Sequence, residues 1–537
     1  MPASWRANRS TLADRLIDPP QQPLARVQQL FRAGRAAEAE RLAREVVAAN
    51  PSSPAALNVL ALVLKGRGAL EEAEKTMRLA IAGAPQDAAL QNNLGNILRM
   101  RSDPAGAEQC YRRAVALARD YAEAFCNLGI VLAERGRKEE ALAAYRRAVA
   151  VRPGYAEAFI LIGVLLAEKG QNADALAAYE RAATLDPRLL PAHRAFSMLA
   201  GQMGERARAA DTYVRARARL GDDPDLLLAE AALRLQLEEP AVAEDLARRA
   251  GAQRDARILL AQALIAQKRF DESIPLLEQC LPADTGEPVA HRELGIALLS
   301  SGQCDRAVSV LEEAHRLAPA DQLILAYLTL AWREAGQGRY ADLVDFDKYV
   351  RSYELPVDGL APMLAAMLES LHTRREAPLN QTLRGGTQTS GNLFANEAPE
   401  IAALRDAIRV AVADYIAALP DDPAHPFLRR KTGDFVFAGS WSCRLRSSGY
   451  HTNHVHQQGW ISSACYIALP EAVTHGEQGW LKFGESNLAL GARDVPERMV
   501  QPAVGKLVLF PSYYWHGTVP FTDAAPRLTV AFDVVPR

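Results

Sequence analysis

The sequence repeats itself every 34 residues over much of its length. Alanines recur at this spacing, and three other residue types keep the same register: a tyrosine four residues after the alanine, a glycine twelve before it and a proline twelve after it. The positions are Ala39, Ala73, Ala107, Ala141, Ala175, Ala209 and Ala243; Tyr111, Tyr145, Tyr179 and Tyr213; Gly95, Gly129 and Gly163; and Pro51, Pro85, Pro153 and Pro187. Four residue types that share one period indicate a repeated structural unit.

Each unit is predicted to form two helices. The segment "AEAFCNLGIVLAERGRKEEALAAYRRAVAVRPGY" carries two apolar stripes at helical spacing, broken by glycine at the turn and by proline after the second helix. The glycine and alanine positions suit a close crossing of the helices, and we expect the tyrosine to fill the groove between neighbouring units. The register weakens after Ala243 and returns at Gly295, Ala307 and Pro319, which gives roughly eight to ten units between residues 24 and 350.

This pattern closely resembles the tetratricopeptide repeat, with "NLGNIL", "NLGIVL", "CYRRAVALA" and "AYRRAVAVRP" at the matching positions. The resemblance implies a right-handed superhelix whose concave face binds an extended peptide or a partner protein. Asn93 and Asn127 each precede a Leu-Gly pair, and we expect them to face the concave surface, where an amide can hydrogen-bond a peptide backbone. They could equally be polar residues that cap a helix face.

The composition changes after residue 350. Residues 359–373 predict one more helix, "LNQTLRGGTQTSGNLF" predicts an irregular segment, and another helix is expected at 398–419. Beyond it the apolar period changes from 3.6 to 2. The short runs are "DFVFAGSWSCRLR", "WISSACYIALP", "GWLKF", "GKLVLFPS", "YYWHGTVP" and "RLTVAFDVV". Such a series of strands predicts a sandwich or a jelly roll.

Three of the ten histidines lie in "HTNHVHQQGW", at 451–460. His454 and His456 are two residues apart at the entrance to a strand, so their side chains should project from the same face, and His516 lies in another strand-like run. Three ligands on one side of a metal leave open positions, as in the facial triad of non-haem iron(II). Arg527 opens the last strand, where a guanidinium could hold a carboxylate at a fixed distance from the metal.

The runs "HVH", "WISSACYIALP", "FPSYYWHGTVPF" and "RLTVAFDVV" resemble the double-stranded β-helix of 2OG-Fe(II) oxygenases of the prolyl-hydroxylase type. The segment "LRGGTQT" resembles the lead-in to this domain when it follows tetratricopeptide repeats. The resemblance implies His454, His456 and His516 as iron ligands, and Arg527 on the far carboxylate of 2-oxoglutarate with Tyr466 as a second hydrogen-bond donor. It also implies Fe(II), 2-oxoglutarate and O2 as reactants, with ascorbate as a possible aid.

His456 stands where most of the superfamily has aspartate, so the site would be one charge unit more positive. Three alternatives follow: an all-histidine triad, two histidines completed by water, or a zinc site without oxygenase activity. His451 would be a ligand only if the strand register slipped, because its odd offset from His454 turns it to the other face. If His456 binds metal, metal affinity should fall as the pH drops through about 6 to 7.

We expect a multidomain chain. Its parts are a flexible N-terminus at 1–23, an all-α tetratricopeptide superhelix at 24–350, a connecting helix or linker at 351–373, and a double-stranded β-helix (jelly-roll) domain at 374–537. The expected function is that of an Fe(II)/2-oxoglutarate-dependent dioxygenase, a hydroxylase whose repeats recruit a protein substrate or partner. No catalytic residue is predicted beyond the metal ligands. The alternative is a non-catalytic tetratricopeptide scaffold with a degenerate or zinc-occupied β-domain.

The composition limits the classes of partner and the cellular compartment that we expect for the protein. Lys plus Arg (62) nearly equals Asp plus Glu (64), so no global basic field favours nucleic acid or an anionic membrane. The six cysteines form no CxxC pair, which suits free thiols in a reducing compartment. We find neither a signal peptide nor a long apolar run, and therefore expect a cytoplasmic protein.

Overall fold

The computed structural model describes residues 21–281, 288–356, 359–374, 376, 381–389 and 391–537. The predicted flexible N-terminus, 1–23, lies outside the described residues except for its last three, with which the first helix begins. The chain divides into two compact units, Met1–Asp186 and Pro187–Arg537. We call them unit 1 and unit 2.

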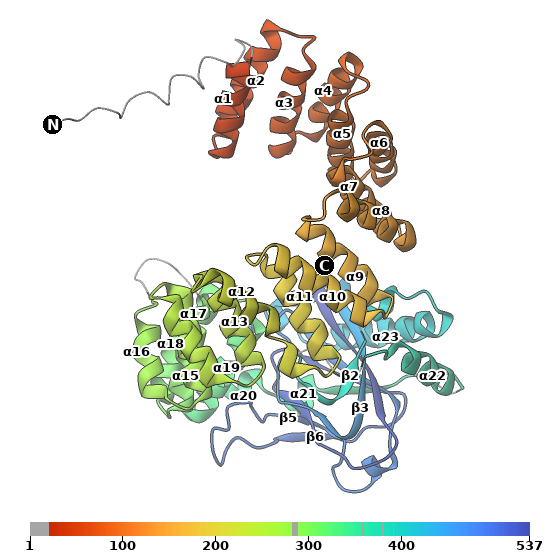
Figure 1. Cartoon of the computed structure of the whole chain (residues 1–537). Helices are drawn as coiled ribbons and strands as arrows, with labels where there is room; N and C mark the ends of the chain where they lie inside the picture. The colour runs from red at the N-terminus through yellow and green to blue at the C-terminus, as the bar shows by residue number, and fades with distance from the viewer. Residues whose placement is uncertain (1–20, 282–287, 357–358, 375, 377–380, 390) are drawn as a thin grey trace, which may run out of the picture. The chain divides into compact units, whose positions relative to one another are not determined.

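Unit 1 consists of antiparallel helix pairs, drawn from red to gold in Figure 1. Its helices are α1 (Gln21–Arg32), α2 (Ala36–Ala49), α3 (Pro54–Gly66), α4 (Leu70–Gly83), α5 (Ala88–Met100), α6 (Pro104–Leu117), α7 (Ala122–Glu134), α8 (Lys138–Val151), α9 (Ala156–Glu168) and α10 (Asn172–Leu185). Most of the turns inside the pairs hold a glycine with positive φ, such as Gly136 at 77°, because this backbone conformation strains other residues. The helix-turn-helix units expected from the period are therefore present.

The repeated tyrosine packs against the glycine of its own helix pair. A Cβ atom added at Gly129 on α7 would lie 2.4 Å from Cε1 of Tyr145 on α8, and the pairs Gly95–Tyr111 and Gly163–Tyr179 show the same contact. The tyrosine rings are almost fully buried. The glycine therefore admits the ring of the following helix, while the expectation that the tyrosine also fills the groove between neighbouring pairs stays a prediction.

Unit 2 continues the helical repeats and then adds the sheets. Its helices are α11 (Leu190–Gln202), α12 (Asp211–Leu220), α13 (Pro224–Gln236), α14 (Pro240–Ala250), α15 (Arg254–Ala266), α16 (Phe270–Glu278), α17 (Pro288–Ser300), α18 (Cys304–Leu317), α19 (Gln322–Glu334), α20 (Arg339–Leu343), α21 (Phe346–Tyr349), α22 (Ala361–Leu371) and α23 (Pro399–Ala418). The last two lie where the sequence predicts helices at 359–373 and 398–419.

Two antiparallel sheets follow the repeats. The larger has six strands in the order β1-β7-β4-β9-β3-β2, and the smaller has three in the order β6-β5-β8. The strands are β1 (Arg351–Glu354), β2 (Leu383–Gln388), β3 (Phe435–His451), β4 (Ile461–Ala468), β5 (Leu481–Phe483), β6 (Arg498–Val500), β7 (Lys506–Pro511), β8 (His516–Thr518) and β9 (Arg527–Pro536). The chain is therefore an α-helical repeat array followed by a sheet-containing region.

Strand β2 lies in a segment that the sequence predicts to be irregular. Its pairing with β3 shifts register between Arg384 and Gly386, and Gly385 at the shift has φ 66°. A Cβ atom at Gly386 would lie only 2.4 Å from the backbone oxygen of Arg444. The glycines therefore permit a bulge and a close approach of two backbones. Because glycine is otherwise a poor strand former, the strand was not predicted from the sequence.

A single hydrophobic core joins the later repeats of unit 2 to its sheets. It includes Ile258 of α15, Leu294 of α17, Leu311 of α18, Leu325 and Leu328 of α19, Leu368 of α22, Ile408 of α23, Phe510 of β7 and Phe532 of β9. Strand β1 arises from the predicted linker and pairs with β7 in the larger sheet. Among the described residues, none of the helices combines the length and apolarity needed to cross a membrane.

Candidate functional site

The two histidines of the "HVH" run lie in the segment between β3 and β4, beside the segment that leads into β8. His454 and His516 form an antiparallel bridge in which each backbone N–H donates to the other's carbonyl oxygen, at 2.9 and 3.0 Å. The backbone N–H of His456 donates to the carbonyl oxygen of Ser512 at 3.0 Å. These bonds hold residues that are far apart in sequence directly opposite one another.

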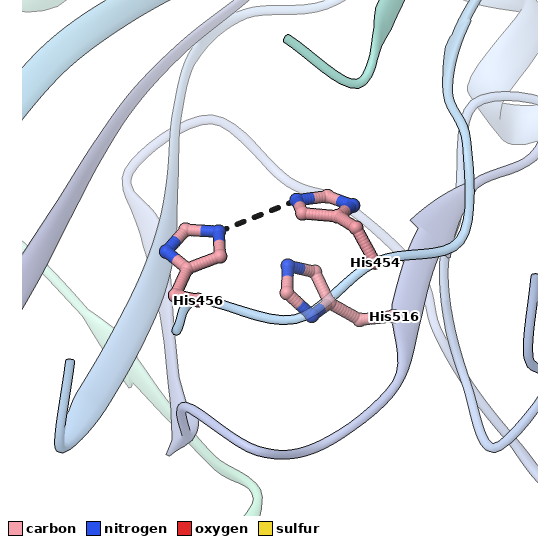
Figure 2. Close-up of side chains that lie close together, drawn as sticks. All are labelled: His454, His456 and His516. Carbon is pink, nitrogen blue, oxygen red and sulfur yellow. Dashed lines mark hydrogen bonds between the residues drawn. The ribbon is translucent and has the colours of Figure 1, made fainter. Parts of the chain in front are cut away.

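The three imidazoles point toward a common centre (Figure 2), and one ring nitrogen of each lies within 4.8 Å of those of the other two. Each Nδ1 lies against an oxygen that can only accept: the carbonyl of Thr452 for His454 at 2.7 Å, that of Tyr514 for His516 at 2.9 Å, and the carboxylate of Asp533 for His456 at 2.5 Å. Each Nδ1 therefore carries a hydrogen in these bonds, which leaves the Nε2 lone pair free.

The Nε2 atoms of His454 and His456 are 3.3 Å apart. This contact is a hydrogen bond when one of the two Nε2 atoms carries a hydrogen (Figure 2), and when neither does, a cation between the two lone pairs removes their repulsion. Two nitrogens bound to one ion at about 2.1 Å are about 3.0 to 3.4 Å apart, depending on the coordination geometry. The observed spacing therefore fits a shared metal ion.

Burial favours the neutral form of two of the three imidazoles. It lowers the pKa of His454 to about 3 and the pKa of His516 well below its usual range. The neighbouring imidazoles add to this effect, because one protonated ring would repel another. Neutral imidazoles are what a divalent metal requires.

The histidines line one side of a cavity of about 420 Å³ in unit 2, and Arg527 lines it as well. Arg527 is 2% exposed, and its Nε–H donates to the carbonyl oxygen of Gly479 at 3.0 Å. This hydrogen bond does not involve the two terminal nitrogens of the guanidinium. Within the described part of the chain Arg527 forms no ion pair. A buried guanidinium of this kind favours an anionic ligand, because an uncompensated buried charge is costly.

Tyr466 of β4 lies beside this arginine. The Arg527 guanidinium carbon is 5.0 Å from the centre of the Tyr466 ring, and the Tyr466 hydroxyl is buried without a hydrogen-bond partner among the described residues. An orphaned hydroxyl next to an unneutralised guanidinium is the donor set that a carboxylate would satisfy. The residues present therefore fit a dicarboxylate that reaches from this pair toward the histidines.

The sequence analysis missed Asp533. It lies six residues after Arg527 on β9, and the side chains at the even offsets between them, Thr529 and Ala531, line the same cavity. The period of a strand could have revealed it, because residues at even offsets share a face. His451 also lines the cavity, but its ring stacks on that of His454 at 5.8 Å and lies outside the group of three.

Asn93 and Asn127 are half-buried in unit 1 and belong to a row of amides that crosses successive repeats. Nδ2 of Asn93 donates to Oδ1 of Asn58 at 3.0 Å, and Nδ2 of Asn127 donates to Oδ1 of Asn92 at 2.8 Å. Each accepting asparagine lies 35 positions before its donor, whereas the repeat period is 34 residues. A search for residues at the repeat spacing therefore did not reveal these pairs. Partner binding by these amides stays a prediction.

Helix α19, which follows the last full-length helix pair of the repeats, contacts both segments that carry the histidines. The backbone N–H of Gln322 at the start of α19 donates to the carbonyl oxygen of Gln457, next to His456, at 3.2 Å. Nε1–H of Trp515, next to His516, donates to the carbonyl oxygen of Ala326 at 3.3 Å. The arrangement of the three histidines is thus supported by α19 as well as by the sheets.

Comparisons with known families agree with this organisation. The family described as "Putative 2OG-Fe(II) oxygenase" matches residues 439–533, a range that includes the three histidines, Arg527 and Asp533. Three tetratricopeptide-repeat families match residues 30–97, 86–154 and 126–189. The chain therefore carries tetratricopeptide repeats in its N-terminal region and a domain of this oxygenase family near its C-terminus, as the sequence predicts.

Among solved structures, the chain is similar to MamA (23% identity, TM-score 0.28), covering 30% of this chain and 95% of that one. It is similar to PilF of Pseudomonas aeruginosa (20% identity, TM-score 0.34), covering 38% and 91%, respectively. It is also similar to YrrB, described as a TPR protein with an unusual peptide-binding site (24% identity, TM-score 0.28), covering 32% and 89%. No curated protein matches the chain.

Proposed function

We propose that the protein is an Fe(II)- and 2-oxoglutarate-dependent oxygenase, a hydroxylase whose tetratricopeptide repeats recruit a protein substrate or partner. The observation that carries the proposal is the cavity with three converging Nε2 atoms, of His454, His456 and His516, and with the buried, unneutralised guanidinium of Arg527. The match to the oxygenase family over the same residues supports it. Two antiparallel sheets with ligands from distant segments support a double-stranded β-helix.

In this proposal each residue has a defined task. The three histidines hold the iron through Nε2 and leave open positions on its other side. Arg527 and the Tyr466 hydroxyl bind the far carboxylate of 2-oxoglutarate, which orients the cosubstrate toward the iron. Iron, when bound with 2-oxoglutarate and O2, would supply the oxidation of a substrate C–H bond to C–OH, while the cosubstrate is converted to succinate and CO2 and takes up the second oxygen atom. Phe510 and Leu481 give the cavity an apolar stretch of wall that a hydrocarbon part of a ligand could contact.

The row of asparagines in unit 1 supports recruitment of a peptide-like partner. Asn93 and Asn127 each use one N–H on a neighbouring asparagine and keep further hydrogen-bonding capacity on a half-exposed side chain. Amides of this kind can bind a peptide backbone without requiring one sequence. The proposed partner is therefore a protein or peptide segment.

The alternative is a scaffold whose sheet domain holds zinc. Three histidines with an open fourth position are also a ligand set for zinc, and this observation alone favours the second candidate. The two functions differ in what they do to 2-oxoglutarate.

The test is turnover by the purified full chain. With Fe(II), O2 and ascorbate we expect 2-oxoglutarate to be converted to succinate, and the His516→Ala variant to lose this activity together with the metal. His475→Ala is the matched control, because His475 is exposed and outside the cavity. Tight zinc binding without any consumption of 2-oxoglutarate in the presence of Fe(II) would favour the scaffold.

A further inference from the structure

We infer that Asp533 is a positioning residue of the metal centre and supplies, from behind His456, the negative charge that the ligand set lacks. The inference rests on the proposed metal-dependent function and adds a residue to it. His454 and His516 rest on neutral carbonyl oxygens, whereas His456 alone rests on a carboxylate, with its Nδ1 2.5 Å from Oδ1 of Asp533. His456, which stands where most of the superfamily has an aspartate, is therefore the histidine whose ring contacts a carboxylate.

The carboxylate of Asp533 is itself held in place. Oδ1 also accepts a hydrogen bond from the Ser462 hydroxyl of β4 at 2.7 Å, and the Ser462 hydroxyl is 2.8 Å from that of Ser512. Ser462 and Asp533 are register partners of β4 and β9. The packing is close, because a Cβ atom at Gly459 would lie 2.3 Å from the Ser512 hydroxyl and 3.5 Å from Cγ of Asp533. Asp533 is thus part of a built network.

This network has two physical consequences. A carboxylate that accepts from Nδ1–H fixes the tautomer and ring orientation of His456, and it makes the Nε2 lone pair a stronger donor to the metal. It also places one negative charge a single imidazole ring away from the ion, so that the three histidines together with Asp533 have the same net charge as a site with two histidines and one carboxylate. Asp533 acts through His456, since its carboxylate lies outside the group of three close ligand atoms.

The test uses the full chain with Co(II) as the only metal, because Co(II) is stable in air and its absorption spectrum depends on its coordination. The affinity of the protein for Co(II) is measured by competition with a chelator. Asp533→Asn keeps an oxygen that can accept from Nδ1–H and removes the charge, and we expect it to weaken Co(II) binding roughly 10- to 100-fold. Ser462→Ala should cost less, because it loosens Asp533 without removing it. Asp434→Asn is the matched control, since Asp434 is paired with Arg537 at 3.6 Å and lies outside the cavity.

A second background separates a positioning residue from a direct ligand. In the His456→Asp background, Asp533→Asn should cost no affinity, because it removes a like charge beside the new carboxylate. Equal loss of Co(II) in both backgrounds would mean that Asp533 binds the metal itself and would overturn the inference. If Asp533→Asn bound Co(II) as tightly as the control variant, the inference would also be overturned. The proposed function would not be affected by that result. A wild-type protein that binds no metal would overturn both. Circular dichroism checks that each variant is folded.

Discussion

The surroundings of Arg527 indicate that its ligand is an anion. Its guanidinium is buried, forms no ion pair among the described residues, and lies over the ring of Tyr466, whose hydroxyl has no partner in the same part of the chain. Burial lowers the pKa of Arg527 from its ordinary value, which is a sign that the charged form is desolvated without a counter-charge. A bound dicarboxylate would remove that cost.

Arg527→Lys should therefore weaken the binding of 2-oxoglutarate by about 1 to 3 kcal/mol, because a point charge replaces a fork that can hold a carboxylate bidentately. Metal content should not change. Calorimetric titration of the metal-loaded protein measures the first and elemental analysis the second. Arg446→Lys is the control, since Arg446 is exposed and pairs with Glu376 at 2.7 Å. Equal loss of metal and cosubstrate would indicate damage to the fold instead.

The histidine cluster predicts an unusual pH dependence. The sequence alone suggests that metal affinity falls near pH 6 to 7, as for ordinary histidines, but burial lowers the pKa of His454 to about 3 and that of His516 well below its usual range. Imidazoles with lowered pKa stay neutral as the pH falls through about 6.5, so protons compete with metal for them only in more acidic solution. We therefore expect protons to compete with Co(II) at neither His454 nor His516 between pH about 7.5 and 5.5, so that at most one histidine of the three loses metal to a proton in this range.

Chelator competition across this range measures the affinity, and a loss much steeper than about tenfold for each pH unit below about 6.5 would contradict the expectation, because it requires more than one histidine to take up a proton. The same shift makes a second prediction for the metal-free protein. Between about pH 6.5 and 3 the unfolded chain binds more protons at His454 than the folded chain does, so the free energy of unfolding should decline as the pH falls through this window.

At the scale of elements, the repeats are specified by a contact between two helices. Gly129 of α7 admits the ring of Tyr145 of α8, and its added Cβ atom would lie 2.4 Å from that ring. In the later repeat with Gly295, the facing residue is Leu311, which makes the same close contact. The glycine is thus retained in a repeat where another large side chain replaces the ring, because both side chains need the same space against the preceding helix.

Gly129→Ala should lower the free energy of unfolding by about 1 to 3 kcal/mol, because the cost of overpacking exceeds the gain of roughly 1 kcal/mol in helix propensity. Gly154→Ala is the matched control in the same unit, since a Cβ atom there meets nothing within 4 Å. Urea unfolding followed by circular dichroism compares the two variants. Equal midpoints would show that the helices can separate without cost.

At the scale of the whole molecule, the repeats and the sheets of unit 2 share one core. The buried cluster runs from α15 to β9, and α19 hydrogen-bonds to the segments that carry His456 and His516. A sheet region cut free at residue 374 would expose the apolar surface that now faces α17 to α22, and it would lose strand β1 from the edge of the larger sheet. The sequence-based boundary at 374 stays a prediction, and the shared core favours an earlier one.

The fragment 187–537 should therefore be soluble with a cooperative thermal transition, whereas the fragment 374–537 should aggregate or unfold at lower temperature. Size-exclusion chromatography and differential scanning calorimetry on the two fragments measure this difference. A soluble 374–537 fragment that binds metal as tightly as the full chain would restore the sequence-based boundary and show that the α19 contacts are dispensable.

The sequence by itself determined the repeats, because a 34-residue period in four residue types can be seen without any fold, and it determined the strand-forming region through the change of apolar period. It also identified His454, His456, His516 and Arg527 as a candidate set, since local spacing and a family resemblance suffice for that. These features depend on neighbours along the chain. The strand β2 was hidden because its glycines serve a bulge and a close approach, which are properties of pairing with β3.

Only the tertiary structure decided how the site is supported. Asp533 backs His456 across 77 residues of sequence, and the helix α19 contacts the segment of His516 across 189. No local pattern encodes such contacts, because they arise where strands and helices distant in sequence are brought together by burial of a shared core. The candidate ligands were therefore readable from the chain, whereas the hydrogen-bond partner of each ring, the lowered pKa values of His454 and His516 and the carboxylate behind His456 follow from what the fold packs against each ring.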